Sequence, residues 1–298
     1  MNAPASVRAD YPTSRLTTVG TGGPARWFAR PERAEELPAI LGWASEQGLP
    51  LAVVGLGSNL LVADAGYDGL VLRLAGDLAR VDRDGERVVC GGGAALAVVV
   101  RRSQEWALAG AEFACAIPGT AGGAVRMNAG AYGSEMSDLL EQARVIGAAG
   151  ERTGGPADLG MHYRRSNVGA DEVVAEAVLR LTSGDPEAIR KKVRDFQGRR
   201  REAQPAKVRT FGSVWKNPGG ELTAGRMLER CGLKGYQVGG ARISPVHANF
   251  IENTGGATSA DVVALMVEAR RRALDEFGVT LEHEVQMLGD LSLPPVVT

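Results

Sequence analysis

Cysteine and histidine are both scarce in this chain of 298 residues, which contains three of each. The cysteines are Cys90, Cys115 and Cys231, and the histidines are His162, His247 and His283. Neither set shows the short spacing of metal ligands, so no metal site is expected. Scattered cysteines of this kind are typical of reduced thiols, which predicts a cytoplasmic protein without disulfides.

Long apolar runs and a charge excess of one sign are also missing. No run approaches the roughly 20 apolar residues of a membrane span, and the start MNAPASVRADYP lacks the apolar core of a secretory signal. The net charge of -1 gives no general attraction for nucleic acid or an anionic membrane. The expected partners are therefore small molecules, and the expected state is a monomer.

Glycine, by contrast, is abundant. The chain has 40 glycines among its 298 residues, a share well above the usual ~7%. They are clustered rather than spread along the sequence. Hydrophobic residues at 44% and charged residues at 23% are ordinary for a globular enzyme. Clustered glycines in such a chain indicate tight, functional loops rather than a flexible low-complexity segment.

Hydrophobic periodicity predicts both helices and strands without regular alternation, which favours an α+β fold. Helices are expected over 31–48, 94–110, 185–201, 223–230 and 259–277. Strands are expected within 49–64, 69–76, 79–93 and 171–181, and around Tyr236 and Asn249. The last helix has Thr258 or Ser259 as its N-terminal cap and ends at Gly278. The main domain boundary is expected near residue 200.

The stretch VVGLGSNLLV (Val53–Val62) begins like a dinucleotide fingerprint, with Gly55 and Gly57 two residues apart. A Rossmann fingerprint requires glycine or alanine at the sixth position, but Leu60 stands there. It also requires a helix after the glycine turn, where a strand is expected in this sequence. Two interpretations remain. The backbone N–H groups bind an anion, helped by Ser58 and Asn59, or the stretch is a hairpin turn.

A second stretch, AIPGTAGGAVRMNAGAYGSE (Ala116–Glu135), holds five glycines within twenty residues, and a third, TTVGTGGPA, spans Thr17–Ala25. A loop so poor in bulky groups is an unlikely core element. Together the three stretches favour one elongated, phosphate-bearing cofactor bound by the main chain over three unrelated turns.

The motifs GTGGPARWF, VVGLGSNLLV, IPGTAGGAVRMNAGAYGSE, YRRS, FGSVWKNP, HANFIEN and LEHEV occur in the order found in the UDP-N-acetylenolpyruvoylglucosamine reductase family. The resemblance covers about residues 14–290. It implies the FAD-binding fold of the vanillyl-alcohol oxidase type, with subdomains 1–70 and 71–199 and a smaller α+β substrate-binding domain over 200–298. It also implies non-covalent FAD, NADPH as the electron donor, and UDP-N-acetylmuramate, a peptidoglycan precursor, as the product.

The resemblance places FAD contacts in the first two glycine-rich stretches. These are Gly55, Gly57, Ser58, Asn59, Gly119, Thr120, Gly122, Gly123 and Asn128. No histidine precedes His162, so none is available in these stretches to bond a flavin. Cys115 is the only other candidate for a covalent link, and a small buried thiol is the alternative for it.

Three catalytic residues follow from the resemblance, each with an ordinary alternative. Arg164 of YRRS would stabilise the substrate carboxylate through two parallel donors, whereas strand alternation would turn Arg165 away; a surface ion pair is the alternative for either arginine. Ser213 would donate a proton, although by its local sequence it also fits a structural turn; a nucleophile elbow is excluded because glycines are missing two residues on either side. Glu284 of LEHEV would act as a protonated acid or as an ionised carboxylate, if it is not simply exposed.

The resemblance further implies substrate contacts at Tyr163, Asn217 and His247, and the basic run 198–209 suggests Lys207 for the diphosphate. Turn stabilisation, a satisfied histidine and a solvated helix end are the alternatives. No tyrosine lies between Arg164 and Ser213, which indicates the shorter branch of the family, without a tyrosine over the substrate. Rival functions are an oxidase of the same fold and a nucleotide-sugar binding protein without redox activity.

Overall fold

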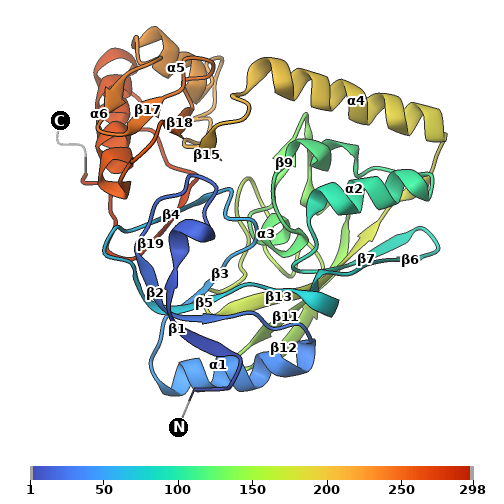
Figure 1. Cartoon of the computed structure of the whole chain (residues 1–298). Helices are drawn as coiled ribbons and strands as arrows, with labels where there is room; N and C mark the ends of the chain where they lie inside the picture. Colours follow the sequence, from blue (N-terminus) through green and yellow to red (C-terminus); the bar gives the residue numbers. More distant parts are fainter. Residues whose placement is uncertain (1–2, 296–298) are drawn as a thin grey trace. The chain divides into compact units, whose positions relative to one another are not determined.

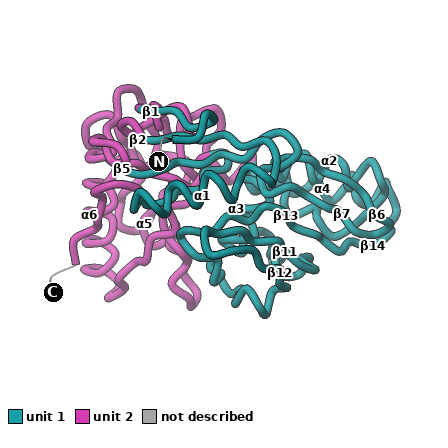
Figure 2. The backbone as a smooth tube through the Cα atoms, turned by 90° about the horizontal axis from the view of Figure 1, so that it is seen from below, with its two compact units in different colours: residues 1–9, 27–56, 69–200 teal, residues 10–26, 57–68, 201–298 magenta. Residues whose placement is uncertain are grey.

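The structure, a computed structural model, describes residues 3–295 (Figure 1). The chain forms two compact units (Figure 2). Unit 1 is made of Met1–Ala9, Trp27–Leu56 and Gly69–Arg200, and unit 2 of Asp10–Arg26, Gly57–Asp68 and Arg201–Thr298. The three-part division into 1–70, 71–199 and 200–298 stays a prediction.

The largest sheet of unit 1 has five antiparallel strands in the order β12-β11-β13-β7-β6. The strands are β6 (Val81–Asp84), β7 (Arg87–Gly91), β11 (Leu140–Gly147), β12 (Gly150–Gly154) and β13 (Glu172–Arg180). The Asp84-Gly85 pair within the expected 79–93 strand region leads into a hairpin, since Gly85 and Glu86 connect β6 to β7 and Asp84 pairs with Arg87. Gly85 has a φ of 62°, a value that tight hairpin turns require and glycine adopts freely.

Three helices of the chain confirm the expected positions: α1 (Leu37–Glu46), α2 (Leu96–Glu105) and α4 (Pro186–Ala203). The expected extent of the second was wrong at its C-terminal end. Ala107 has a φ of 54°, which takes the chain out of the helix, and β8 (Leu108–Ala109) then pairs with β14 (Thr182–Ser183). Apolar periodicity alone did not reveal this break.

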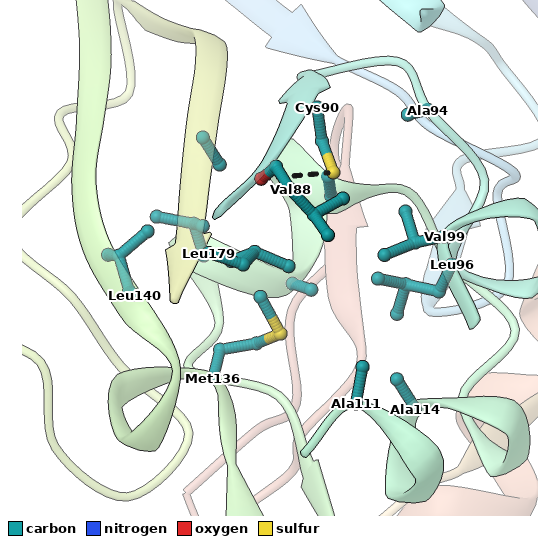
Figure 3. Packing of buried hydrophobic residues seen from close by; sticks show 14 of the residues in the cluster. Val88, Cys90, Ala94, Leu96, Val99, Ala111, Ala114, Met136, Leu140 and Leu179 are labelled. Carbon is teal, nitrogen blue, oxygen red and sulfur yellow. Dashed lines mark hydrogen bonds between the residues drawn. The ribbon is translucent and has the colours of Figure 1, made fainter. Parts of the chain in front are cut away.

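The core of unit 1 gathers side chains from β7, α2 and the segment 111–114 around Met136 (Figure 3). Val88, Leu96 and Val99 are each 0% exposed, and burial of one such side chain contributes about 1.5–3 kcal/mol. Cys90 lies among them, and its thiol reaches the carbonyl oxygen of Val88 at 4.0 Å. Burial raises the pKa of Cys90 to about 12, so this side chain contributes to core packing and is not a nucleophile.

The second glycine-rich stretch is more ordered than expected. Residues Ala121–Arg126 form a short helix, α3, and Ala121, Ala124 and Val125 are buried in the core. The expectation of an open loop was therefore wrong here. The small residues allow close packing, because a Cβ on Gly122 would lie 2.9 Å from the Gly92 carbonyl oxygen. Beyond α3, β9 (Gly130–Ala131) pairs with β10 (Ser134–Glu135).

The first glycine-rich stretch joins two strands that belong to different sheets. β3 (Leu51–Val53) pairs in parallel with β5 (Tyr67–Leu72), in the four-stranded order β1-β2-β5-β3 with β1 (Val7–Pro12) and β2 (Pro24–Ala29). β4 (Leu60–Val62) pairs in parallel with β19 (Gln286–Leu288). The hairpin alternative is thereby excluded, since the strands flanking the turn do not pair with each other.

Unit 2 contains an antiparallel sheet in the order β15-β18-β17-β16. Its strands are β15 (Arg209–Ser213), β16 (Gln237–Val238), β17 (Ala241–Ile243) and β18 (Phe250–Asn253), and its helices are α5 (Ala224–Arg230) and α6 (Ser259–Phe277). The predicted caps of α6 are confirmed. Thr258 Oγ1 accepts the N–H of Asp261 at 3.0 Å, and Gly278 adopts a left-handed φ of 66°.

Candidate active site

Ser213 ends β15 immediately after a β-bulge. Thr210 pairs with Glu252 and Ser213 with Phe250, so β15 has one residue more than β18 between these pairs. Gly212 carries a φ of 84° at this point, and a bulge of this kind interrupts strand alternation and redirects the following side chain. Phe211 is consequently buried in the unit 2 core, whereas Ser213 is half-buried.

The segment after Ser213 runs antiparallel to the LEHEV segment. Trp215 pairs with His283, the N–H of Glu284 donates to the Val214 carbonyl at 2.7 Å, and the N–H of Lys216 donates to the Glu282 carbonyl at 2.9 Å. Ser213 and Glu284 therefore lie on neighbouring antiparallel segments of the same chain. Ser213 is one residue away from the position directly opposite Glu284. The LEHEV segment is therefore extended at its centre.

The two glutamates of LEHEV differ in their surroundings. The Glu282 carboxylate forms an ion pair with the Lys216 ammonium, and its side chain is 73% exposed. Glu284 is half-buried. The Glu282 end of this ion pair therefore lies at the surface, where such pairs contribute little, whereas the role of Glu284 stays a prediction.

The Ser58–Asn59 part of the first glycine-rich stretch lies against the same two segments. The side-chain amide of Asn59 donates to the Glu284 carbonyl at 3.1 Å, and the Asn59 carbonyl accepts the N–H of Gln286 at 3.0 Å. A Cβ on Gly212 would come within 3.3 Å of the Ser58 carbonyl oxygen. Unit 2 alone therefore brings together Asn59, Ser213 and Glu284, which lie far apart in the sequence.

Arg164 belongs to unit 1 and lies in a turn rather than a strand. The backbone N–H and C=O groups of His162 and Arg165 bond to each other at 3.0 and 2.9 Å, which closes the turn over Tyr163 and Arg164. The expectation of strand alternation at YRRS was wrong for this reason. Arg164 adopts a φ of 56°, its Nη2 donates to the Gly130 carbonyl at 2.9 Å, and its guanidinium carbon lies 4.8 Å from the Tyr163 ring centre.

The glycines predicted to contact FAD fall into two groups by the space around them. A Cβ added at Gly55 would lie 2.5 Å from Thr120 Oγ1, and one added at Gly57 would lie 1.7 Å from the Leu16 carbonyl oxygen. Packing within the chain therefore already requires glycine at these two positions, as it does at Gly122. At Gly119 the nearest atoms would be 4.0 Å away, and at Gly123 3.4 Å. Neither has a positive φ, so packing within the chain gives no reason for glycine at these two positions.

A cofactor phosphate provides such a reason, because a missing side chain lets the main chain approach it. In the described residues 3–295, the amide N–H groups of Gly119 and Thr120, both in unit 1, have no acceptor from the chain. Unpaired amides beside small residues are the donors that a diphosphate requires. The residues present therefore fit the FAD that the sequence implies.

The residues predicted to contact the substrate differ in their surroundings. Asn217 Oδ1 accepts the N–H of Ala224 at the start of α5 (3.1 Å), whereas Lys207 is exposed with a φ of 57°. His247 Nδ1 accepts the N–H of Asn249 at 3.1 Å, so the neutral ring carries its proton on Nε2. Burial, and after it the charge of Lys234, lower the pKa of His247 below its ordinary value.

Two asparagines have structural partners that the sequence did not indicate. Asn249 is bound to Trp215 through both amide atoms, at 2.9 Å each, and it thereby fixes the chain beyond Ser213. Asn128, a predicted FAD contact, is 0% exposed, and its carboxamide is bonded to backbone groups of His162 and Ser137. Both stand in polar motifs, where sequence alone does not separate ligand contacts from backbone contacts.

Neither a metal cluster nor a membrane helix is found in the described part of the chain. No group of three or more His, Cys, Asp or Glu side chains there is placed to hold a metal ion. No helix among residues 3–295 is both long and apolar enough to cross a membrane.

Comparison with known proteins defines the class first. Residues 25–153 match the model of the FAD binding domain, and residues 204–288 match the UDP-N-acetylenolpyruvoylglucosamine reductase C-terminal domain. A crystal structure of UDP-N-acetylenolpyruvylglucosamine reductase from Thermus caldophilus superposes with a TM-score of 0.82 at 36% identity, covering 95% of this chain and 98% of that one. The predicted α+β FAD-binding fold is confirmed, and the protein is a flavoprotein of this class.

Curated relatives then identify the family. A UDP-N-acetylenolpyruvoylglucosamine reductase of Anaeromyxobacter dehalogenans is 45% identical over 96% of this chain and 86% of its own length. One from Symbiobacterium thermophilum is 43% identical over 96% and 93%. The chain belongs to the UDP-N-acetylenolpyruvoylglucosamine reductase family, as the motifs predicted.

Proposed function

We propose that this protein reduces the enolpyruvyl ether of UDP-N-acetylglucosamine to UDP-N-acetylmuramate, a step of peptidoglycan precursor synthesis, with FAD as cofactor and NADPH as electron donor. The observation that carries the proposal is the adjacency of Ser213 and Glu284 in unit 2, fixed by the bond from Glu284 N–H to the Val214 carbonyl. Membership of the reductase family supplies the reaction for which these groups are suited.

FAD would be held without a covalent bond by main-chain donors of the glycine-rich stretches, which in unit 1 include Gly119 and Thr120. When bound, it supplies the hydride that adds to the terminal carbon of the enolpyruvyl group. Cys115 has another role in the fold, since its thiol lies 3.8 Å from the Val193 carbonyl and burial raises its pKa.

Arg164 would stabilise the negative charge that develops on the substrate carboxylate during reduction. Its guanidinium presents a planar set of donors that matches two carboxylate oxygens. The bond to the Gly130 carbonyl at 2.9 Å fixes one end of the group and orients the rest. A donor fixed before the reaction is worth more than one that must reorganise.

Ser213 would give its hydroxyl proton to the carbon next to the reduced position. A serine hydroxyl is a weak acid, but an enediolate is a strong base and requires mainly a well-placed donor. The bulge at Gly212 would set the direction of this hydroxyl. Glu284 would complete the group, either as a protonated donor or as an ionised carboxylate that orients one.

Tyr163, Lys207, Asn217 and His247 would contact the substrate, and the Nε2 proton of His247 makes that residue a neutral donor. NADPH would reduce the cofactor and leave before the enolpyruvyl sugar binds, which gives ping-pong kinetics. We further infer a monomer acting in the cytoplasm; the described cysteines Cys90, Cys115 and Cys231 are all free thiols, as a reducing compartment allows.

The test uses the purified protein under anaerobic conditions. We expect a flavin absorbance spectrum, bleaching by NADPH, and recovery of colour on addition of the enolpyruvyl sugar with formation of the lactyl ether. Recovery of colour with oxygen but not with the sugar would instead identify an oxidase. Protein that stays colourless after incubation with FAD would identify a binding protein without redox activity.

A further inference from the structure

Asn128 is a buried polar residue for which the proposed chemistry has no use. It follows α3 directly, is 0% exposed and adopts a φ of 39°. Its Nδ2 donates to the His162 carbonyl at 3.2 Å, and its Oδ1 accepts the N–H of Ser137 at 2.9 Å. The carboxamide is thus engaged at both ends by backbone of the chain itself.

The His162 carbonyl stands at the base of the turn that carries Arg164. The same carbonyl accepts the N–H of Arg165 that closes this turn. Arg164 adopts a left-handed φ of 56°, which costs free energy in a residue with a side chain and persists only where neighbouring contacts determine it. Asn128 provides one such contact from outside the turn.

Arg164 returns to the same stretch of chain. Its Nη2 donates to the carbonyl of Gly130, two residues after Asn128. Backbone and side chain of the turn are therefore fixed against one short segment. A second connection, Ser166 Oγ to the Arg126 carbonyl at 2.7 Å, lies beyond the turn and does not hold its base.

We propose that Asn128 is a positioning residue for Arg164: by bridging the His162 carbonyl and the Ser137 N–H it holds the turn in the conformation that orients the guanidinium. This proposal rests on the role proposed above for Arg164. The Asn128 carboxamide bonds to the protein backbone at both ends, and the FAD contact of this residue stays a prediction.

The experiment is a double-mutant cycle on the FAD-loaded enzyme, with the two half-reactions followed separately. Asn128→Ala should slow reoxidation by the enolpyruvyl sugar by about 10- to 100-fold, because small misplacements of a catalytic group cost rates of this order. Bleaching by NADPH should stay within about twofold of wild type. In an Arg164→Ala background, Asn128→Ala should cause less than about a twofold further loss, since its partner is gone.

Hydrogen exchange gives a readout that is independent of activity. Peptides covering 159–167 should exchange faster in Asn128→Ala, because the turn loses its external donor. Ser166→Ala is the matched control: it removes a side-chain-to-backbone bond in the same segment without touching the His162 carbonyl, and its reoxidation rate should stay within about threefold of wild type.

Several results would overturn the proposal. They are an unchanged reoxidation rate, an equal loss in both half-reactions, a full additional loss in the Arg164→Ala background, or the same loss in Ser166→Ala. If Asn128→Ala does not fold, Asn128→Asp keeps the acceptor for Ser137 and removes the donor to His162. Failure of both variants to fold would make Asn128 a stability residue and would also end the proposal. Failure of the proposed function looks different: wild type is not reoxidised by the sugar, or Arg164→Ala has no effect.

Discussion

The backbone N–H of Glu284 donates to the carbonyl oxygen of Val214 at 2.7 Å. This hydrogen bond places Glu284, which carries the proposed carboxylate, on the segment next to Ser213, the proposed proton donor. In the sequence, 71 positions separate Ser213 from Glu284. The two residues therefore lie on adjacent backbone segments of unit 2. Changes to either of them, or to the segments that hold them, should affect the same chemical step.

The two glutamates of LEHEV provide a matched pair. Glu284→Gln should slow reduction of the enolpyruvyl sugar by about 10²–10³-fold, the usual loss for one stabilising group in a reacting site. Glu282→Gln should leave the rate within about threefold and change the free energy of unfolding by less than about 1 kcal/mol, because the Glu282 side chain of this ion pair is 73% exposed. Steady-state kinetics and urea unfolding measure both. Similar kinetic losses in the two variants would contradict the assignment.

Gly212 and Gly219 offer a second pair, with left-handed φ values of 84° and 86°. A side chain at either position should cost about 1–2 kcal/mol of folding free energy. Only Gly212→Ala should also slow proton donation, because the bulge directs Ser213 and because the new Cβ would lie 3.3 Å from the Ser58 carbonyl. A Cβ added at Gly219 would have no atom within 4 Å. Equal activity of the two variants, at equal stability, would show that the bulge does not direct Ser213.

Gly119 separates cofactor binding from folding. The chain has room for a Cβ there, with the nearest atoms 4.0 Å away, so Gly119→Ala should leave the unfolding free energy of the FAD-free protein unchanged within about 0.5 kcal/mol. Its affinity for FAD should nevertheless fall about tenfold or more, equal to at least ~1.4 kcal/mol.

The control for this substitution is Gly122→Ala, whose Cβ would lie 2.9 Å from the Gly92 carbonyl. That variant should lose folding stability whether or not FAD is present. FAD titration of the FAD-free proteins and their denaturant unfolding supply both quantities. Undiminished FAD affinity of Gly119→Ala would remove this glycine from the cofactor site.

His247 should give a defined pH dependence of stability. Its pKa in the folded protein is lowered, first by burial and then by Lys234, whereas in the unfolded chain it stays near ~6.5. Between these two values the unfolded state binds more protons, so the free energy of unfolding rises with pH. The contribution is complete above about pH 6.5 and is lost as the pH falls through the lowered pKa.

The variant for this test is His247→Asn, which keeps an acceptor for the Asn249 N–H but does not titrate. Denaturant unfolding between pH 5 and 7.5 should show a shallower rise for the variant than for wild type. Identical pH profiles of the two proteins would mean that His247 is not buried as the structure shows.

Local chemistry made much of the fold predictable. The Thr258 cap and Gly278 of α6, and the Asp-Gly hairpin between β6 and β7, follow from hydrogen bonds and backbone angles set within a few residues. The order of the motifs likewise identified the family. These features depend little on the rest of the molecule.

The parts that could not be predicted depend on distant partners. The turn at Tyr163–Arg164 is stabilised by Asn128 and Gly130, and neither leaves a signal in YRRS. Small residues in the second glycine-rich stretch suggested a loop, yet packing against Gly92 stabilises α3. Asparagine in a polar motif is equally suited to a ligand and to a backbone amide, and Asn128 and Asn249 both proved to hold backbone.

Anaerobic stopped-flow measurement on Ser213→Ala tests whether Ser213 is the proton donor. We expect bleaching by NADPH at the wild-type rate, because Ser213 takes no part in that half-reaction. Reoxidation by the enolpyruvyl sugar should slow by about 10²–10⁴-fold, the range for loss of a general acid. Equal losses in both half-reactions, or undiminished reoxidation, would contradict this role and make Ser213 a structural residue of the turn.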